Sequence, residues 1–442
     1  MANPVIGIFR VKELRERIIF TVLMLIVFRL GAVLPIPGVN VQELNAYFLS
    51  QQNSGNAIID YLDFFAGGAF SNFSVFMLGI MPYISMSIIM QLLLIVFPSL
   101  KKISQEEGGK KKIQAYQRYG TVVVCLIQSF AVTQYAQSIS RSVENLLSMG
   151  MLPFTLIAML TVTTGTLFLM WMGEQITKRG IGNGISLLIF AGIVARLPDA
   201  IWELIGRVRS GDLNLVFVIV VFVMFVVVVA LVVFEQQGQR KIPVHYAKRV
   251  VGRRMYGAQS TYIPFKINPS GVIPVIFASS ILTFPLQIAS TIGGNVAWLA
   301  AVSRALSPQG GLYTTLYVLL IIFFAYFYTQ VSLNPIEIAK NIRENGGSIP
   351  GIRTERIEEY LTKILNRIVL PGSLYLAVIA VLPTLIQRLF NFPSSISYLM
   401  GGTSLLIMVG VDLDTMSQIE ALLKMHHHEG LTKKGHLRGR NL

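Results

Sequence analysis

The sequence predicts an all-α polytopic membrane protein, in which ten transmembrane helices form two inverted five-helix halves beside a short half-inserted helix. Three observations predict this class. The 442 residues are 53% hydrophobic and only 13% charged, whereas soluble domains carry about 25% charged residues. The apolar residues gather into runs long enough to cross a bilayer. Two motifs of the first half also recur, in the same order, in the second half.

Ten apolar runs define the predicted spans. Their limits are 18–36, 74–98, 119–136, 153–172, 181–194, 213–234, 267–288, 312–331, 368–386 and 396–411. The first run is too long for a signal-peptide core, so we expect it to be retained. The fifth is short for a spanning helix and is expected to extend into its flanking loop. The halves are then 18–195 and 196–416, with an N-terminal segment at 1–17 and a tail at 417–442.

Lysine and arginine set the predicted orientation. No Lys or Arg occurs between Arg29 and Lys101, so the first loop is expected outside. The next loop is basic and contains Lys101, Lys102, Lys110, Lys111, Lys112 and Arg118. The loop after the sixth run is also basic, which places these loops and both termini in the cytoplasm. Because each half has an odd number of spans, the second half is inverted relative to the first.

Two motifs are repeated along the chain. The pattern GxxPxIxxS occurs at 79–87 and again at 271–279. The pattern GxSLLI, followed by a further glycine, occurs at 184–189 and at 402–407. Chance similarity between apolar segments is the alternative, but two motifs in matching order favour a true repeat. Duplicated halves with Gly- and Pro-interrupted helices point to a central transport path.

The stretch 60–98 differs most from an ordinary membrane anchor. It opens with an aromatic, glycine-rich sequence that includes Phe64, Phe65, Gly67, Gly68 and Phe70. A polar break follows at Ser71 and Asn72, and the next apolar run carries Gly79 and Pro82 in its first half. Irregular backbone at membrane depth persists only where protein buries it or water reaches it. We therefore expect a half-inserted helix at about 60–72 and a spanning helix whose interruptions lie near a cavity.

Isoleucines recur beside these interruptions. Ile80 and Ile84 are four residues apart and share one helix face. Ile276 in the second half occupies the position that Ile84 has in the first half, and Ile407 likewise corresponds to Ile189. A ring of isoleucines would make a narrow constriction that resists water and ions and binds no passing side chain. Ordinary core packing is the alternative and is favoured for any one isoleucine alone, whereas the repeat-related set favours the ring.

Two loops are longer than topology requires. The first arm, at about 235–266, alternates Ile, Val and Tyr with basic residues and predicts a protruding hairpin. The second arm, at about 334–367, is nearly charge-balanced. An orientation signal needs only a few charges, so docking of a partner is the preferred interpretation of both arms. The net charge of +15 agrees both with positive cytoplasmic loops and with a basic docking surface.

Few residues suit catalysis, metal binding or ion coupling. Arg29 is the charge within a span, and no acid lies mid-span beside the Gly and Pro positions, which argues against a proton- or sodium-coupled transporter. The single cysteine, Cys125, excludes an internal disulfide. The three histidines at 426–428 are interpreted as solvated tail rather than as a metal site. Because no nucleotide-binding loop, zinc motif or catalytic triad occurs, we expect neither enzyme activity nor a cofactor.

Several long motifs make the chain similar to a known family. They include FRLGAVLPIPG, FSVFMLGIMPYISMSII, TGTLFLMWMGEQITKRGIGNGIS, GVIPVIFASSI, NPIEIAKN, GSIPGIR and GGTSLLI. On these motifs the chain resembles the SecY family, the central subunits of the bacterial Sec protein-translocation channel. The resemblance covers about residues 10–440 and implies an hourglass of two hinged halves, with 60–72 as a plug. Its pore ring would be Ile80, Ile84, Ile189, Ile276 and Ile407, with Ile185 nearby.

The resemblance also implies a lateral gate, docking sites and partners. The gate to lipid would be formed by Ser85, Ser87 and Gln91 of the second span and by Ser279, Ile281 and Phe284 of the seventh. The ribosome and the SecA motor ATPase would dock through Arg240, Lys248, Arg249, Arg253, Arg254 and Arg353. SecE and SecG would be small membrane partners in the cell inner membrane, and unfolded preprotein with its signal sequence the substrate. Asp412, beside Asp414, departs from the expected apolar pattern and is interpreted as a helix cap or as unimportant.

The residues and the resemblance together predict a protein-conducting channel, against two alternatives. An inverted-repeat secondary solute transporter would need a polar or acidic site at the bilayer midplane. A membrane insertase or receptor without a pore would need neither a constriction nor a plug.

Overall fold

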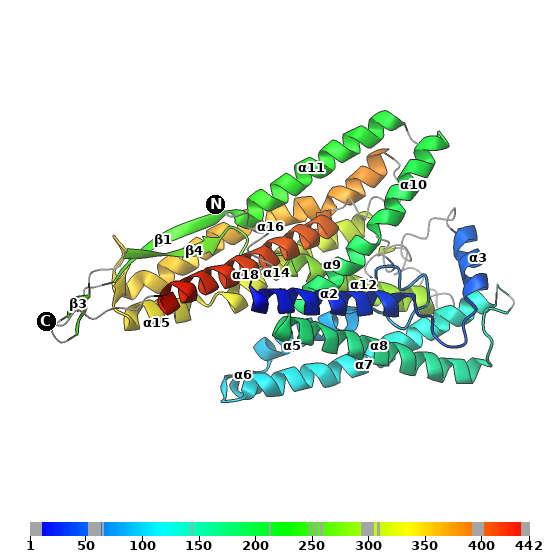
Figure 1. Ribbon diagram of the computed structural model, residues 1–442, viewed down its shortest axis with the longest axis horizontal. Coiled ribbons are helices and arrows are strands. Elements are labelled where there is room, and N and C mark those ends of the chain that lie inside the picture. Colours follow the sequence, from blue (N-terminus) through cyan, green and yellow to red (C-terminus); the bar gives the residue numbers. More distant parts are fainter. Residues whose placement is uncertain are drawn as a thin grey trace. The chain divides into compact units, whose positions relative to one another are not determined.

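The computed structural model describes residues 11–51, 63, 66–141, 143, 145–211, 214–246, 249–251, 254–256, 260–292, 305–306, 310–390 and 402–434. The chain is mainly helical (Figure 1). It divides into two compact units. Unit 1 comprises residues 1–203, 290–296 and 411–442, and unit 2 comprises residues 204–289 and 297–410.

Unit 1 contains the helices of the first half of the chain. They are α2 (Lys12–Val33), α3 (Val41–Gln51), α5 (Met81–Val96), α6 (Pro98–Gln105), α7 (Gly109–Ser140), α8 (Met151–Arg179) and α9 (Gly184–Ala195). α7 packs along α8 and α5, and α8 also contacts α9 and α2. Two further helices, α10 (Leu197–Arg209) and α18 (Gly402–Lys434), each begin in one unit and end in the other.

Unit 2 contains both arms and the later helices. Its helices are α11 (Leu215–Gln237), α12 (Ile273–Ile292) up to residue 289, α14 (Gly311–Ser332), α15 (Pro335–Glu344) and α16 (Ile357–Phe390). Its strands are β1 (Gln239–Tyr246), β2 (Arg249–Val251), β3 (Arg254–Tyr256), β4 (Ser260–Lys266) and β5 (Gly347–Ser348). α16 packs against α14 and contacts α11 and α15.

The described residues contain fewer apolar spans than the ten predicted. Six helices there are long and apolar enough to cross a membrane, or seven if α5 and α6, which meet at 103°, form one bent span. The predicted spans 18–36 and 267–288 correspond to α2 and α12, and residues 396–401 lie outside the described part of the chain. The fifth span extends as predicted, because α9 and α10 form one apolar stretch over Gly184–Arg209.

The two GxxPxIxxS motifs begin helices and do not interrupt them, which corrects the expected span over 74–98. Gly79 has φ +56° and Gly271 has φ +59°, and α5 and α12 each start two residues later. Such a left-handed φ favours glycine. Pro82 and Pro274 then lie in the first helical turn, where a missing N–H loses no hydrogen bond. The matching geometry of both copies supports a true repeat.

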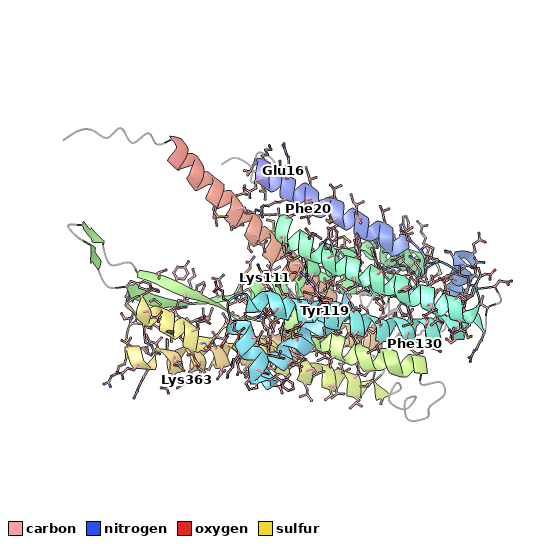
Figure 2. The ribbon with its side chains drawn as sticks, turned by 90° about the horizontal axis from the view of Figure 1, so that it is seen from below. Glu16, Phe20, Lys111, Tyr119, Phe130 and Lys363 are labelled. Carbon is pink, nitrogen blue, oxygen red and sulfur yellow. The ribbon has the colours of Figure 1, made fainter. Side chains whose placement is uncertain are left out.

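Some of the residues predicted to lie in basic loops belong to helices, so two helices start earlier than predicted. α7 starts at Gly109 instead of residue 119 and carries Lys110, Lys111, Lys112 and Arg118. α16 starts at Ile357 instead of residue 368, so the end of the second arm is the beginning of a long helix. Lys111 near the start of α7 and Lys363 near the start of α16 are both exposed (Figure 2). These helices therefore extend past their apolar stretches into polar surroundings.

The first arm is an antiparallel hairpin, as predicted. β1 pairs with β4 along most of its length, and β2 pairs with β3 in a separate two-stranded sheet. β5 completes a sheet of order β4-β1-β5 through the pairs His245↔Ser348 and Tyr246↔Gly347. Because β5 belongs to the second arm, this sheet joins the two arms, which was not predicted.

One face of the β4-β1-β5 sheet is buried against α15 and α16 and forms what we call the arm core. Its buried members are Ile242, Val244, Phe265, Ala339, Ile342, Ile349, Ile357, Leu361, Ile364, Leu365 and Ile368. The opposite face carries exposed Lys241 and Tyr262, with the Lys241 Nζ 4.8 Å from the centre of the tyrosine ring. Buried and exposed residues alternate along this part of β1, as in a half-buried strand.

Candidate functional site

The Gly-rich segment, which comprises Asp63 and residues 66–73, has little regular structure. Asp63 and Ala66 are helical, and residues 67–73 form turns. Gly67 and Gly68 have φ of +64° and +89°, a left-handed conformation that ends a helix. The half-helix predicted over 60–72 is therefore too long at its end. The predicted plug residues Phe64 and Phe65 lie outside the described residues.

Glycines bring this segment against α9. A Cβ atom placed on Gly67 would lie 2.6 Å from the Cα of Gly192, so only glycine permits the contact without a shift of the backbone. Gly192 is the glycine that follows the repeated GxSLLI motif, and the contact gives its small size a structural reason. A Cβ atom placed on Gly68 would lie 3.3 Å from the guanidinium of Arg196. The segment therefore lies directly on the end of α9.

An ion pair joins the Gly-rich segment to the residue that ends α9. Oδ2 of Asp63 contacts Nη2 of Arg196, and the two side chains are only 8% and 28% exposed. Oδ1 of Asp63 accepts a hydrogen bond from the backbone N–H of Ser71 at 2.7 Å. Nη2 of Arg196 also donates to Oγ of Ser71 at 3.4 Å. Buried charges are tolerated when they are paired and hydrogen-bonded, so Asp63 and Arg196 depend on each other.

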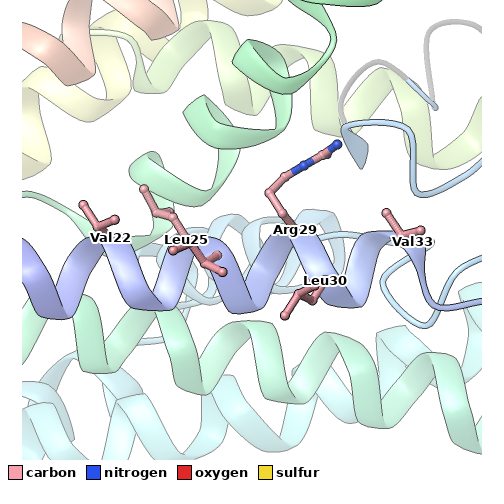
Figure 3. A pocket seen from close by; sticks show the side chains of 6 residues that line it. Val22, Leu25, Arg29, Leu30 and Val33 are labelled. Carbon is pink, nitrogen blue, oxygen red and sulfur yellow. The ribbon is translucent and has the colours of Figure 1, made fainter.

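Arg29, the charge within the first predicted span, contacts the Gly-rich segment from α2. Figure 3 shows its side chain extending from α2 beside a shallow apolar groove lined by Val22, Leu25, Ile26, Leu30 and Val33. Nη1 of Arg29 donates a hydrogen bond to the carbonyl oxygen of Gly67 at 2.9 Å. An arginine at membrane depth normally has a specific partner, and the backbone of the Gly-rich segment is that partner.

Aromatic rings of the segment pack on α7. The centre of the Phe70 ring lies 5.7 Å from that of Tyr135, and Phe73 stacks on Tyr135 at 6.0 Å. Both phenylalanines are buried. Phe73 has φ +44°, which a bulky residue adopts only where its surroundings impose it. Contacts with α2, α7 and α9, rather than its own secondary structure, therefore shape the segment.

The predicted pore-ring isoleucines are distributed over both units. The buried ones are Ile80, Ile84, Ile189 and Ile407, and the partly buried ones are Ile185 and Ile276. Ile80 directly precedes α5, and its carbonyl oxygen accepts from the N–H of Ile84 at 3.2 Å. These two residues of unit 1 are therefore one helical turn apart, as expected. The ring itself stays a prediction.

The predicted lateral-gate residues lie on α5 and α12. They are Ser85, Ser87 and Gln91 on α5, and Ser279, Ile281 and Phe284 on α12. Oε1 of Gln91 is buried and has no hydrogen-bond partner among the described residues. Oγ of Ser279 donates to the carbonyl oxygen of Ile276 at 2.8 Å, so this hydroxyl is satisfied within its own helix. The side chain of Phe284 lies outside the described part, and the gate stays a prediction.

The predicted docking residues lie on the two arms. Arg240 is exposed on β1, and Arg353 is exposed just before a 3-10 turn at Thr354–Arg356. Arg249 and Arg254 lie on the paired strands β2 and β3. Lys248 and Arg253 are outside the described residues. Because the β4-β1-β5 sheet joins the arms, the surfaces that carry Arg240 and Arg353 belong to one folded body.

The described part of the chain contains no group of three or more His, Cys, Asp or Glu side chains that could hold a metal ion. The three histidines at 426–428 lie on α18, and their side chains are not described. α18 continues to Lys434, so Asp412 does not cap a helix end, which corrects that interpretation. Asp412 is exposed on this helix.

Asp63 and Arg196 were not predicted as site residues. The available signals were an acid within the aromatic, glycine-rich stretch and an arginine just past a predicted span. Their pairing depends on α9 passing the Gly-rich segment, which is separated from it by more than a hundred residues. Hydropathy and motif spacing carry no information about such a contact.

The chain is similar to SecY proteins over nearly its whole length. The family model for SecY matches residues 74–416. The protein translocase subunit SecY of Borreliella burgdorferi is 46% identical over 438 residues, which cover 99% of both chains. The protein translocase subunit SecY of Escherichia coli K12 is 46% identical over 431 residues, covering 97% of this chain and 96% of that one.

Solved structures of protein-conducting channels share the fold. One described as the structure of a protein conducting channel has a TM-score of 0.65 at 19% identity, and covers 92% of both chains. A structure of canine Sec61 in a ribosome–channel complex has a TM-score of 0.61 at 18% identity, again over 92% of both chains. At such identities the likeness concerns the fold alone.

Proposed function

The chain belongs to the SecY family, and we propose that it is the channel subunit of a protein translocase. It passes unfolded secretory polypeptides across a membrane and releases apolar segments sideways into the lipid. The observation that carries this proposal is the Gly-rich segment, which contacts α2, α7 and α9 and precedes α5 in the chain. A short segment held by side-chain contacts suits a plug, because it closes a pore at rest and leaves without unfolding a helix of the scaffold.

Isoleucines form the constriction of the proposed pore. A hydrophobic ring excludes water and ions, and it offers no polar ligand that would retain some passing side chains and not others. Its members are Ile80, Ile84, Ile189, Ile276 and Ile407, with Ile185 beside them. The position of these residues on or beside the helices that the repeated motifs begin supports this assignment.

The proposed lateral gate lies between α5 and α12. Small side chains let two helices approach closely and separate again, and Ser85, Ser87, Ser279 and Ser280 supply them. Both helices begin after a left-handed glycine, at Gly79 and Gly271, which makes the start of each helix a natural point of movement.

The joined arms are the proposed docking surface for the ribosome and for the motor ATPase SecA. Exposed Arg240 and Arg353, together with the other arginines and lysines of the first arm, suit an anionic partner such as ribosomal RNA. SecE and SecG complete the translocase as small membrane subunits. The basic arms lie in the cytoplasm with both termini, and the chain spans the cell inner membrane.

A secondary solute transporter is the less favoured function. Such a transporter needs an accessible acidic or polar site for its substrate or coupling ion. Asp63, the buried acid of the Gly-rich segment, is already bound by Arg196 and by the backbone N–H of Ser71. It is therefore a structural group of the Gly-rich segment and not a free coupling site.

Site-directed photo-crosslinking tests the proposed function. A photoreactive residue at Ile276 is combined with a secretory polypeptide stalled halfway through export. We expect a cross-link between the two, because Ile276 lines the proposed pore. Val378 on α16 of the same unit is 65% exposed and serves as the matched control, for which no cross-link to the stalled chain is expected. A cross-link at Val378 and none at Ile276 would place the polypeptide outside the bundle and overturn the channel assignment.

A further inference from the structure

We propose that Arg196 is the positioning residue of the plug, and that its ion pair with Asp63 sets how readily the plug leaves its closed position. The inference rests on the proposed function, because it takes the Gly-rich segment as the plug. Arg196 touches no substrate; it acts on the segment. Arg29 assists it from α2 by binding the carbonyl oxygen of Gly67.

The first argument is the burial of the pair. The side chain of Asp63 is 8% exposed, so its carboxylate has little contact with water and needs protein partners. Arg196 supplies the opposite charge, and the N–H of Ser71 supplies a hydrogen bond at 2.7 Å. If the plug moves away, the side chain of Asp63 must separate from that of Arg196. The ion pair therefore opposes displacement of the plug until the contact is broken.

The second argument is that Arg196 stands on a fixed support. It directly follows α9, and a cation is favoured at the C-terminal end of a helix. The start of α9 is held by Asn183, whose side chain caps it, and by Thr177, whose Oγ1 accepts from the N–H of Gly184 at 2.9 Å. A Cβ atom at Gly184 would lie 2.0 Å from the carbonyl oxygen of Gly173, so α9 and α8 are in backbone contact.

The third argument is that the segment has little structure of its own to hold it in place. Residues 67–73 form turns, and Phe73 has a positive φ that its surroundings impose. If the plug is displaced, the segment is therefore the part that moves, and α9 is the support from which it separates. Arg29 on α2 and Arg196, which directly follows α9, both contact the segment. The sequence from residue 30 to residue 100 contains no basic residue.

A second carboxylate near Arg196 provides an internal control. Oδ2 of Asp199 lies 3.8 Å from Nη1 of Arg196, but the side chain of Asp199 is 72% exposed. Water screens so exposed a pair, and its contribution is small. If the buried pair positions the plug, removing the charge of Asp63 has a large effect, whereas removing that of Asp199 has almost none.

The test is the resting leak of the complete translocase complex, reconstituted in liposomes, to a small anionic dye. Arg196→Gln leaves the buried carboxylate of Asp63 without its opposite charge, and Asp63→Asn removes that charge from Arg196; we expect about a tenfold rise in leak for each. Asp199→Asn should leak like the unmodified protein. Arg196→Lys keeps the charge but loses the planar fork, so its leak should lie between those of the unmodified protein and Arg196→Gln.

The double variant Asp63→Asn/Arg196→Gln shows whether the two residues act as a pair. Because it removes both charges, it should leak no more than either single variant. Leaks that multiply in the double variant, or single variants that leak like Asp199→Asn, would overturn the positioning role. Thermal unfolding of each complex, with midpoints matching the unmodified protein, ensures that leak reports plug position and not loss of fold.

Export of a secretory polypeptide by the same liposomes, with motor ATPase and ATP added, separates the two proposals. If the unmodified complex exports polypeptide and the variants do not leak, the positioning role fails while the proposed function stands. If the unmodified complex exports none, the proposed function fails, and the inference about the plug fails with it.

Discussion

One substitution on α15, Ile342→Ala, is expected to destabilise the arm core. Ile342 is 3% exposed and packs with buried residues of the β4-β1-β5 sheet and α16. Removing a buried isoleucine side chain to the β-carbon destabilises a core by about 2–5 kcal/mol. The arm core is small and bordered by solvent, so we expect the lower part of that range, about 2–3 kcal/mol.

The same helix supplies the matched control. Ile336 is 59% exposed near the start of α15, so Ile336→Ala removes no core contact and should change stability by less than about 0.5 kcal/mol. The comparison holds the helix, the residue type and the substitution constant. Only burial differs between the two positions.

Amide hydrogen exchange of the purified complex measures the effect. A loss of about 2–3 kcal/mol corresponds to a fall in protection of roughly 30- to 150-fold, since each 1.4 kcal/mol is tenfold. We expect this fall in peptides from β1, β4 and the start of α16, and none in α7, which belongs to the other unit. Equal effects of Ile342→Ala and Ile336→Ala, or a fall spread over the whole chain, would refute the idea that the arms share one separate core.

Three further predictions concern the proposed plug, the proposed pore and the proposed docking surface. Gly67→Ala places a Cβ atom within 2.6 Å of the Gly192 backbone. It also puts alanine in a left-handed φ, which costs about 1–2 kcal/mol apart from the clash. Resting dye leak should therefore rise, and an unchanged leak would contradict the close contact. Polar substitution of Ile84 or Ile276 should loosen the closed state and permit export of proteins with defective signal sequences, measured in an export assay; unchanged stringency would count against the ring. Arg353→Glu reverses a charge on an exposed turn, so motor-driven export should fall sharply. The thermal midpoint of the complex should stay within a few degrees of that of the unmodified protein. Normal export would show that Arg353 is not part of the docking surface.

The membrane class, the internal repeat and the family were open to prediction because each depends on local or repeated sequence. Hydropathy is a sum over neighbouring residues, and the GxxPxIxxS motif is recognised wherever it stands. The alternation of β1 likewise predicted a hairpin, which β1 and β4 form. The role of the motif was misjudged, however. Gly79 and Pro82 were expected to interrupt a helix, and whether a Gly–Pro pair breaks or begins one depends on the conformation before it, which composition does not reveal.

The tertiary structure alone decided which distant residues meet. The Asp63–Arg196 pair, the contact between Gly67 and Gly192 and the two-residue strand β5 that joins the arms each link segments separated by a hundred residues or more. The sequence does not reveal whether a charged side chain is exposed to solvent or buried in an ion pair. Burial decides whether the charge needs a partner. The sequence by itself determined that this chain crosses a membrane several times, because that information is local. Where the Gly-rich segment is held, and by what, was decided by packing.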